Sequence, residues 1–207
     1  RRTKVGSAAV VGVNIGKNKV TEAADAPLDY AYCARLLAPY ADYIVVNVSS
    51  PDTPGLRDLQ STEALRPILE HARSGAREGA PDRHVPLLVK IAPDLADSDI
   101  DSVAELALDL GLDGIVATNG THRREGLHTS HMALDKIGSG RLSGAPLAQR
   151  AVEVVRRIHT RSGGNFPIIG VGGIMSPADA KAMLDAGADL LQLYTGYIYE
   201  GPGLVGE

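Results

Sequence analysis

The sequence predicts a parallel α/β fold that forms most of a (β/α)8 TIM barrel. Three observations predict it. Short apolar runs alternate with helical patterns, each run ends in glycine or polar residues, and the 207 residues suffice for one domain, 1–207. The runs are rich in β-branched residues, as in strands that are covered on both faces. They occupy residues 8–16, 43–50, 86–92, 114–119, 167–173 and 190–196.

Helical spacing of apolar residues connects these runs. It predicts helices over 27–41, 62–79, 97–110 and 146–160, and Ser176-Pro177 is typical of a further helix start. Asp94 and Asp97 are interpreted as helix-start caps.

A doubly wound sheet is the alternative to the barrel. The GKNK segment at 16–19 lacks the G-x-G-x-x-G spacing that follows the first strand of a dinucleotide-binding fold. A barrel typically needs about 250 residues, so about six βα units are expected here, with N-terminal units missing before Arg1. Polar residues and glycines gather where the predicted strands end, which is the face on which barrels build their sites. These are Asn14, Asn47, Lys90, Asn119, Gly172, Gly173, Tyr194 and Thr195.

Composition excludes several classes of function. The net charge is −4, the chain has no tryptophan and one phenylalanine, and neither a basic face nor a stacking platform for nucleic acid is expected. Cys33 is the only cysteine, which excludes an internal disulfide. The histidines at 122, 128 and 131 have no carboxylate or cysteine at ligand spacing, so no metal site is expected.

Two features indicate an anionic, phosphorylated ligand. Lys90 ends an apolar strand, where an ammonium needs an anionic partner, either a ligand or a salt bridge at the rim. The segment GVGGIMSPADA places Gly172 and Gly173 before a helix, and exposed backbone N–H groups there suit a phosphate, although a tight turn would look the same. Ser143 and Gly144 precede another helix, where they could supply a further donor to the phosphate or could only cap the helix.

The segment VVNVSSPDTPGLRDLQ, residues 45–60, ends a strand in a cluster of small polar residues. Asn47 offers a donor and an acceptor, which suits the edge of a heterocycle. Ser50 needs help from its surroundings to take a proton. No histidine lies near enough in sequence to make a hydrolase triad. The cluster therefore indicates an active-site loop.

The chain resembles the class 2, quinone-dependent dihydroorotate dehydrogenases. The resemblance rests on GVNIGKNK, DYIVVNVSSPDTPGLRDLQ, LLVKIAPDL, DGIVATN, LSGAPL, PIIGVGGI and LLQLYTGYIYEGP, in this order over nearly the whole chain. It implies an FMN-binding barrel, an oxidoreductase acting on a CH-CH bond. The reaction implied is oxidation of dihydroorotate to orotate, with a membrane quinone as acceptor, in de novo pyrimidine biosynthesis.

The resemblance also implies a role for individual residues. Ser50 matches the base that removes the proton from C5 of dihydroorotate, and Lys90 matches the cation beside the flavin ring. Asn47 also matches a substrate contact, as do Asn119 and the positions of Asp52 and Gly120. Nine residues are assigned to the FMN site, and Gly172 is among them because it lies in the same glycine turn as Gly173. They are Asn14, Asn47, Lys90, Thr118, Gly144, Gly172, Gly173, Tyr194 and Thr195.

Three positions depart from the family pattern. Asp52 stands where the family has asparagine, Gly120 where it has a hydroxyl residue, and Arg141 where it has glycine. They leave three alternatives open: a flavin-dependent relative acting on another small substrate, a flavin binder without turnover, and a phosphate-binding barrel without flavin. The family's N-terminal quinone and membrane segment is expected to be absent from residues 1–207. A peripheral place on the cytoplasmic side of the cell membrane is implied by the resemblance alone.

Overall fold

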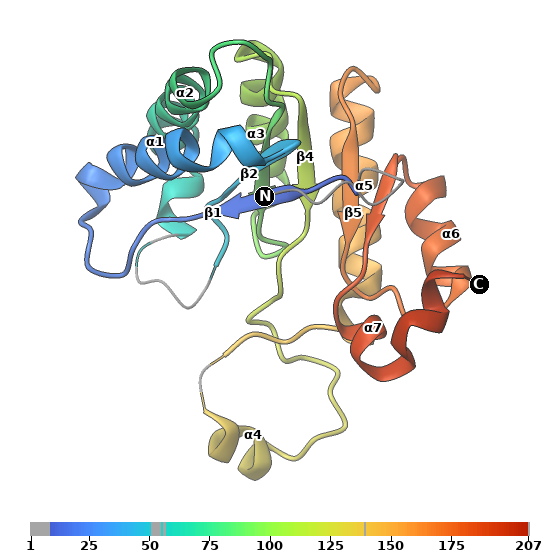
Figure 1. Ribbon diagram of the computed structural model, residues 1–207. Coiled ribbons are helices and arrows are strands. Elements are labelled where there is room, and N and C mark those ends of the chain that lie inside the picture. Colours follow the sequence, from blue (N-terminus) through green and yellow to red (C-terminus); the bar gives the residue numbers. More distant parts are fainter. Residues whose placement is uncertain (1–8, 51–54, 56, 139, 207) are drawn as a thin grey trace.

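The computed structural model describes residues 9–50, 55, 57–138 and 140–206. Its six strands form one parallel sheet in the order β1-β2-β3-β4-β5-β6 (Figure 1). In a doubly wound sheet the strand order reverses, because later strands are added on the opposite side of the first strand. In a barrel each strand is added beside the previous one. The observed order is therefore that of a barrel. The strands are Gly12–Ile15, Tyr43–Asn47, Leu87–Ile91, Gly114–Ala117, Ile168–Val171 and Leu190–Gln192.

The helices follow the predicted alternation closely. The prediction for 62–79 is confirmed at both ends by α2, whereas the helix predicted at 146–160 lies two residues later, because Pro146 belongs to the 3-10 turn Ala145–Leu147. Ser176 caps α6 as predicted, accepting from the Asp179 N–H at 3.3 Å. The α-helices α1 to α7 are Ala26–Leu37, Thr62–Gly79, Asp97–Asp109, His131–Ile137, Ala148–Ser162, Pro177–Asp185 and Thr195–Glu200.

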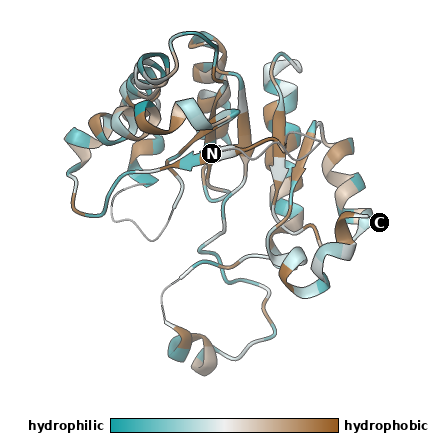
Figure 2. Ribbon diagram, in the orientation of Figure 1, coloured by the Kyte–Doolittle hydropathy of each residue, from teal (hydrophilic) through white to brown (hydrophobic). Residues whose placement is uncertain are grey.

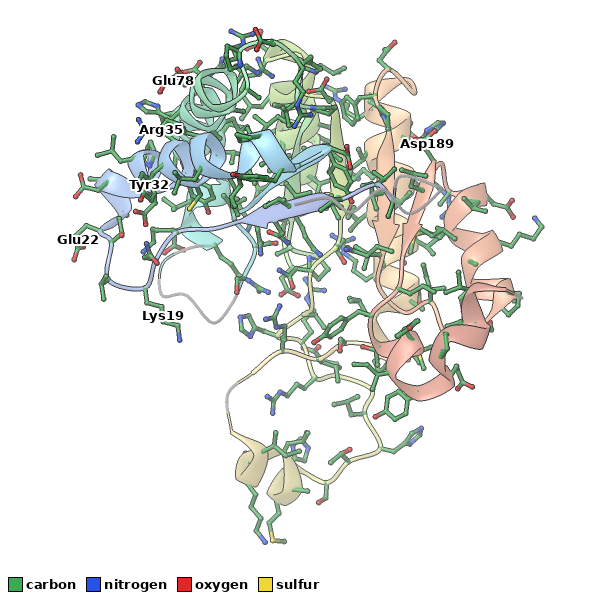
Figure 3. The ribbon with its side chains drawn as sticks, in the orientation of Figure 1. Lys19, Glu22, Tyr32, Arg35, Glu78 and Asp189 are labelled. Atoms are coloured by element: carbon green, nitrogen blue, oxygen red, sulfur yellow. The ribbon has the colours of Figure 1, made fainter. Side chains whose placement is uncertain are left out.

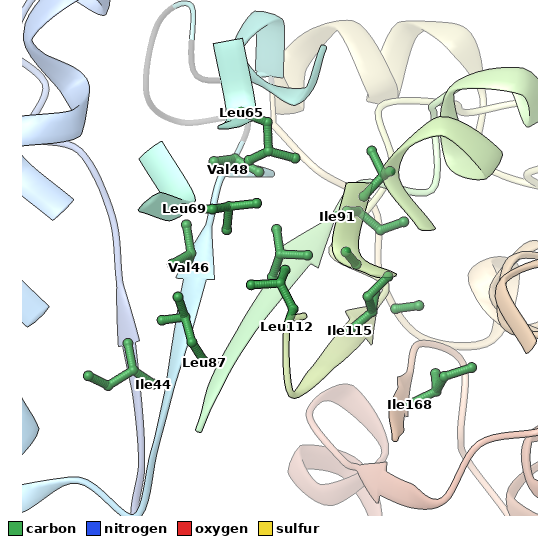
Figure 4. Close-up of a cluster of buried hydrophobic side chains, with 14 of the residues drawn as sticks. Ile44, Val46, Val48, Leu65, Leu69, Leu87, Ile91, Leu112, Ile115 and Ile168 are labelled. Carbon is green, nitrogen blue, oxygen red and sulfur yellow. The ribbon is translucent and has the colours of Figure 1, made fainter. Parts of the chain in front are cut away.

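The two faces of the sheet have different partners. Alternate side chains such as Ile44, Val46 and Ile115 point into the layer between sheet and helices and are fully buried there (Figure 4). The other face carries a smaller apolar cluster that includes Val45 and Val116. Figure 2 shows the hydrophobic colour concentrated on the strands and the inner sides of the helices. Because the helices pack on one face of the sheet, the second face forms the inner wall of a partial barrel.

The sheet does not close on itself within the described residues. There β1 pairs only with β2, and β6 pairs only with β5. A long connection between β4 and α5 carries the short helix α4 away from the sheet (Figure 1). An antiparallel bridge between Thr121 and Leu142 joins the two ends of this connection, which places Gly120 beside Arg141.

The closest helix contact joins α1 and α2 through two glycines. A Cβ atom on Gly75 would lie 2.2 Å from the Ala31 carbonyl oxygen, and one on Gly79 would lie 2.1 Å from that of Arg35. Arg35 also faces Glu78 and Tyr32 here (Figure 3), but its guanidinium is 3.9 Å from the Glu78 carboxylate and both side chains are exposed. Exposed pairs contribute little, so glycine sets the helix spacing.

Gly75→Ala should therefore destabilise the protein. Alanine gains roughly 1 kcal/mol of helix propensity, but the clash is with backbone that cannot rotate away, and overpacking costs about 1–3 kcal/mol or more. We expect a lower urea midpoint for Gly75→Ala. Ser74→Ala, an exposed change on the same turn, is the control and should be neutral or slightly stabilising. A Gly75→Ala variant as stable as wild type would contradict the close crossing.

Candidate active site

A cavity of about 510 Å³ opens at the carboxyl ends of β3 to β6. It is large enough for a cofactor or a small substrate. The structure brings most of the predicted site residues to its wall, from four strands and from the loops that follow them. Those that line it are Lys90, Thr118, Asn119, Gly120, Gly144, Gly172, Gly173, Tyr194 and Thr195.

Lys90 supplies the central charge of the cavity. It lies on β3 opposite Asn47 of β2 and Val116 of β4, and its Nζ donates to the Gln192 side-chain oxygen at 3.2 Å. Burial, and then the nearby Arg141 guanidinium, lower the Lys90 pKa to about 8. Within the described part of the chain, Lys90 forms no salt bridge, and no carboxylate lines this cavity. Lys90 is thus placed for an anionic ligand.

A chain of buried hydrogen bonds joins the ends of β2 and β4 beside this lysine. The Ser49 hydroxyl donates to the Asn47 side-chain oxygen at 2.8 Å and accepts from the Asn119 side-chain nitrogen at 3.0 Å. The Ser49 N–H also donates to Asn47, at 3.0 Å. The oxygen of the Asn47 amide is used in this way, so its NH2 group is what it can offer to a ligand.

A glycine-lined hollow forms the other end of the cavity. Gly173 has a φ of +76°, and a Cβ there would lie 2.3 Å from the Ala148 Cα at the start of α5. Gly144 has a φ of +84°, and Ser143 and Thr195 are joined by their hydroxyls at 2.8 Å. Backbone N–H groups and hydroxyls at a helix start suit a phosphate. The hollow therefore fits the predicted phosphate cradle.

Arg57 and Asp94 are site residues that the sequence analysis missed. Arg57 bonds to Asp94 and donates to the backbone oxygens of Gly120 at 2.9 Å and Ser49 at 3.4 Å. Burial raises the Asp94 pKa, but hydrogen bonds from Thr121, the His122 N–H and Arg57 together outweigh it and hold the pKa below its ordinary value. An ionised Asp94 thus ties the loops after β2, β3 and β4 together.

The interpretation of Asp94 as a helix cap is therefore wrong. Helix α3 begins after Ala96 without a side-chain cap, and the Asp94 carboxylate instead faces Arg57, 37 residues earlier. The signal available in the sequence was positional: Asp94 and Arg57 both follow neighbouring parallel strands, whose carboxyl ends meet.

The remaining predicted residues lie around the cavity or outside the described residues. Asn14 lines a smaller hollow of about 50 Å³ on the inner wall, together with Lys90. Ser50 is half-buried and follows the bonded Ser49 directly. Asp52 lies outside the described residues. His122 approaches the Gly140 carbonyl oxygen at 3.4 Å, and the described residues contain no group of three or more side chains that could hold a metal ion.

Fold and site define a β/α-barrel protein with a cavity at the carboxyl ends of its strands, and the charged side chains that line this cavity are those of Lys90 and Arg141. The family model described as dihydroorotate dehydrogenase matches residues 2–207. The chain belongs to this family. The fold class is confirmed by the crystal structure of the Eimeria tenella DHODH in complex with ferulenol, with a TM-score of 0.88 at 36% identity. That match covers 98% of this chain and 57% of the other.

Two curated relatives carry the name dihydroorotate dehydrogenase (quinone). The protein from Kineococcus radiotolerans is 60% identical over 194 residues, which are 94% of this chain and 53% of the relative. The protein from Arthrobacter sp. is 56% identical over 202 residues, 98% of this chain and 56% of the relative. The chain thus spans about half the length of these relatives. In the stretches that the structure describes, no helix is both long and apolar enough to cross a membrane.

The lowered Lys90 pKa can be measured directly. Nuclear magnetic resonance titration of the lysine side chains should show one group with a midpoint near 8, missing in Lys90→Met. Arg141→Gln should move this midpoint upward, because the like charge is removed while burial remains. A Lys90 midpoint at the ordinary 10.5, or one that Arg141→Gln leaves unchanged, would contradict the arrangement.

Proposed function

We propose that the full-length protein oxidises dihydroorotate to orotate with FMN as cofactor and a quinone as electron acceptor. The observation that carries the proposal is the position of Lys90 in the cavity, next to the Asn47–Ser49–Asn119 hydrogen-bond chain. A half-buried cation beside two amide groups suits a planar, anionic heterocycle. Relatives at 56–60% identity that are named for this reaction support it.

FMN fits the residues that are present. Gly144, Gly173 and Thr195 line the cavity together, and their backbone N–H groups and the Thr195 hydroxyl would hold its phosphate. Lys90 lies toward the inner wall, where a positive charge stabilises a ring that gains electrons. Asn14, Asn47, Thr118, Gly172 and Tyr194 are proposed as further cofactor contacts. When bound, FMN supplies the two-electron acceptor.

The protein's own groups bind the substrate and move its proton. Ser50 takes the proton from C5 of dihydroorotate, while the hydride leaves the neighbouring carbon. The adjacent Ser49 is unsuited to this role, since its hydroxyl already donates to Asn47 and accepts from Asn119. Asn47, Asn119, Gly120 and Asp52 are proposed as substrate contacts.

The acceptor and location are proposed from the family alone. A membrane quinone reoxidises the cofactor, and the protein works as a peripheral protein on the cytoplasmic side of the cell membrane.

Anaerobic mixing of the full-length protein with dihydroorotate tests the proposed reaction. We expect the flavin absorbance to bleach, and added quinone to restore it. A yellow protein that dihydroorotate does not bleach would overturn the substrate and favour a relative with another substrate or without turnover. A colourless protein that takes up no FMN would overturn the cofactor.

Ser50→Ala should slow flavin reduction by at least about a hundredfold, the usual scale for losing a positioned acid–base group. Its FMN content and orotate affinity should stay near wild type, because Ser50 is assigned to proton transfer rather than to binding. Stopped-flow reduction over a range of pH checks this. An unchanged rate would show that another group takes the proton.

A further inference from the structure

Arg141 occupies the space that a side chain at position 120 would need. The bridge between Thr121 and Leu142 sets the two loop ends side by side. A Cβ on Gly120 would lie 2.9 Å from the Arg141 Cδ and 3.0 Å from the Leu142 carbonyl oxygen. The two positions at which this chain departs from the family's hydroxyl and glycine are therefore in contact, and the arginine stem fills the volume beside Gly120.

The Arg141 guanidinium also determines what Asn119 can offer a ligand. Arg141 Nη1 and the Gly120 N–H donate to the Asn119 side-chain oxygen, at 2.7 and 2.8 Å. Both groups are donors, so the atom they share has to be the oxygen, and the amide nitrogen has to face Ser49. With its oxygen used twice, Asn119 presents only N–H to a ligand, which suits a ligand oxygen.

Charge points to the same kind of ligand. Lys90 and Arg141 both line the cavity, and the other described lining residues are neutral. The two positive charges disfavour each other, and an anion between them removes that repulsion. Arg141 is an exposed residue on the wall of the cavity. A planar guanidinium matches a carboxylate in two parallel hydrogen bonds.

We propose that Arg141 is a substrate-binding residue that recognises the substrate's carboxylate, replacing a side-chain hydroxyl at position 120. The inference rests on the proposed function. The carboxylate is favoured over the cofactor phosphate because Arg141 bonds to Asn119, whereas the glycine hollow lies around Gly144 and Gly173 at the start of α5.

Calorimetric titration of the full-length, FMN-loaded protein tests this without turnover. The ligands are orotate and its methyl ester, which lacks the negative charge. Arg141→Gln should weaken orotate binding about 10- to 100-fold, the scale of a hydrogen bond to a charged group. Ester binding should change by less than about threefold, and FMN content should not change. Lys136→Gln, with the same charge change at an exposed position of the same connection, is the control and should bind orotate like wild type.

Each other outcome overturns a defined part of the account. Unchanged orotate affinity in Arg141→Gln overturns the inference alone, and equal losses for orotate and ester reduce Arg141 to a positioning residue for Asn119. If Arg141→Gln loses FMN but binds orotate normally once FMN is added back, the guanidinium binds the cofactor phosphate instead of the substrate. A wild-type protein that binds FMN but not orotate overturns the proposed function itself.

A double-mutant cycle tests the shared space independently. Gly120→Ser should weaken orotate binding in the presence of Arg141, because the new Cβ meets the arginine stem. In an Arg141→Gly background the same change should strengthen orotate binding, because the arginine stem is gone, only the Leu142 carbonyl oxygen at 3.0 Å has to give way, and a hydroxyl is regained. Additive effects would contradict the coupling.

Discussion

Ser49 holds the two halves of the candidate site in register. Its hydroxyl donates to Asn47 at the end of β2 and accepts from Asn119 just after β4, across the intervening strand that carries Lys90. The Ser49 side chain is fully buried, so a broken bond could not be replaced by water without opening the strand ends. This one hydroxyl therefore bonds both amides and helps to orient each of them.

The loops around the cavity depend on a second, charged network. Arg57 reaches the backbone of Ser49 and Gly120, and Asp94 binds Arg57, Thr121 and the His122 N–H. These bonds fix the start of the long β4–α5 connection, and the Thr121–Leu142 bridge fixes its end. Arg141 is thereby held against Asn119, and the Lys90 charge is set beside a second cation. The positive charge of the cavity thus depends on loop anchoring as much as on the lysine itself.

Much of this arrangement was predictable from local patterns. The six apolar runs predicted the strands, and the polar residues at their ends predicted which of them would meet, because carboxyl ends of parallel strands share one face. Helix α2 was predictable to the residue, since Ser61 caps it and apolar spacing continues to Gly79. Strand order, which separates a barrel from a doubly wound sheet, required the tertiary structure.

Long-range partners were not predictable in the same way. Asp94 stands just before a predicted helix, which locally favours a capping role. Its carboxylate instead binds Arg57, which lies 37 residues earlier in the chain. Gly120 and Arg141 each looked like an isolated departure from the family, and only the structure shows that the two positions are in contact. Ser49 looked like the neighbour of a candidate base, whereas its two hydrogen bonds make it the centre of the network.

The most direct test of this account is the orotate affinity of a full-length Ser49→Ala variant, measured by calorimetry together with its FMN content and thermal midpoint. The account predicts a loss of affinity of about tenfold or more with FMN retained, because both amides lose a partner that orients them. Wild-type orotate affinity in Ser49→Ala would contradict the claim that this hydroxyl organises the site.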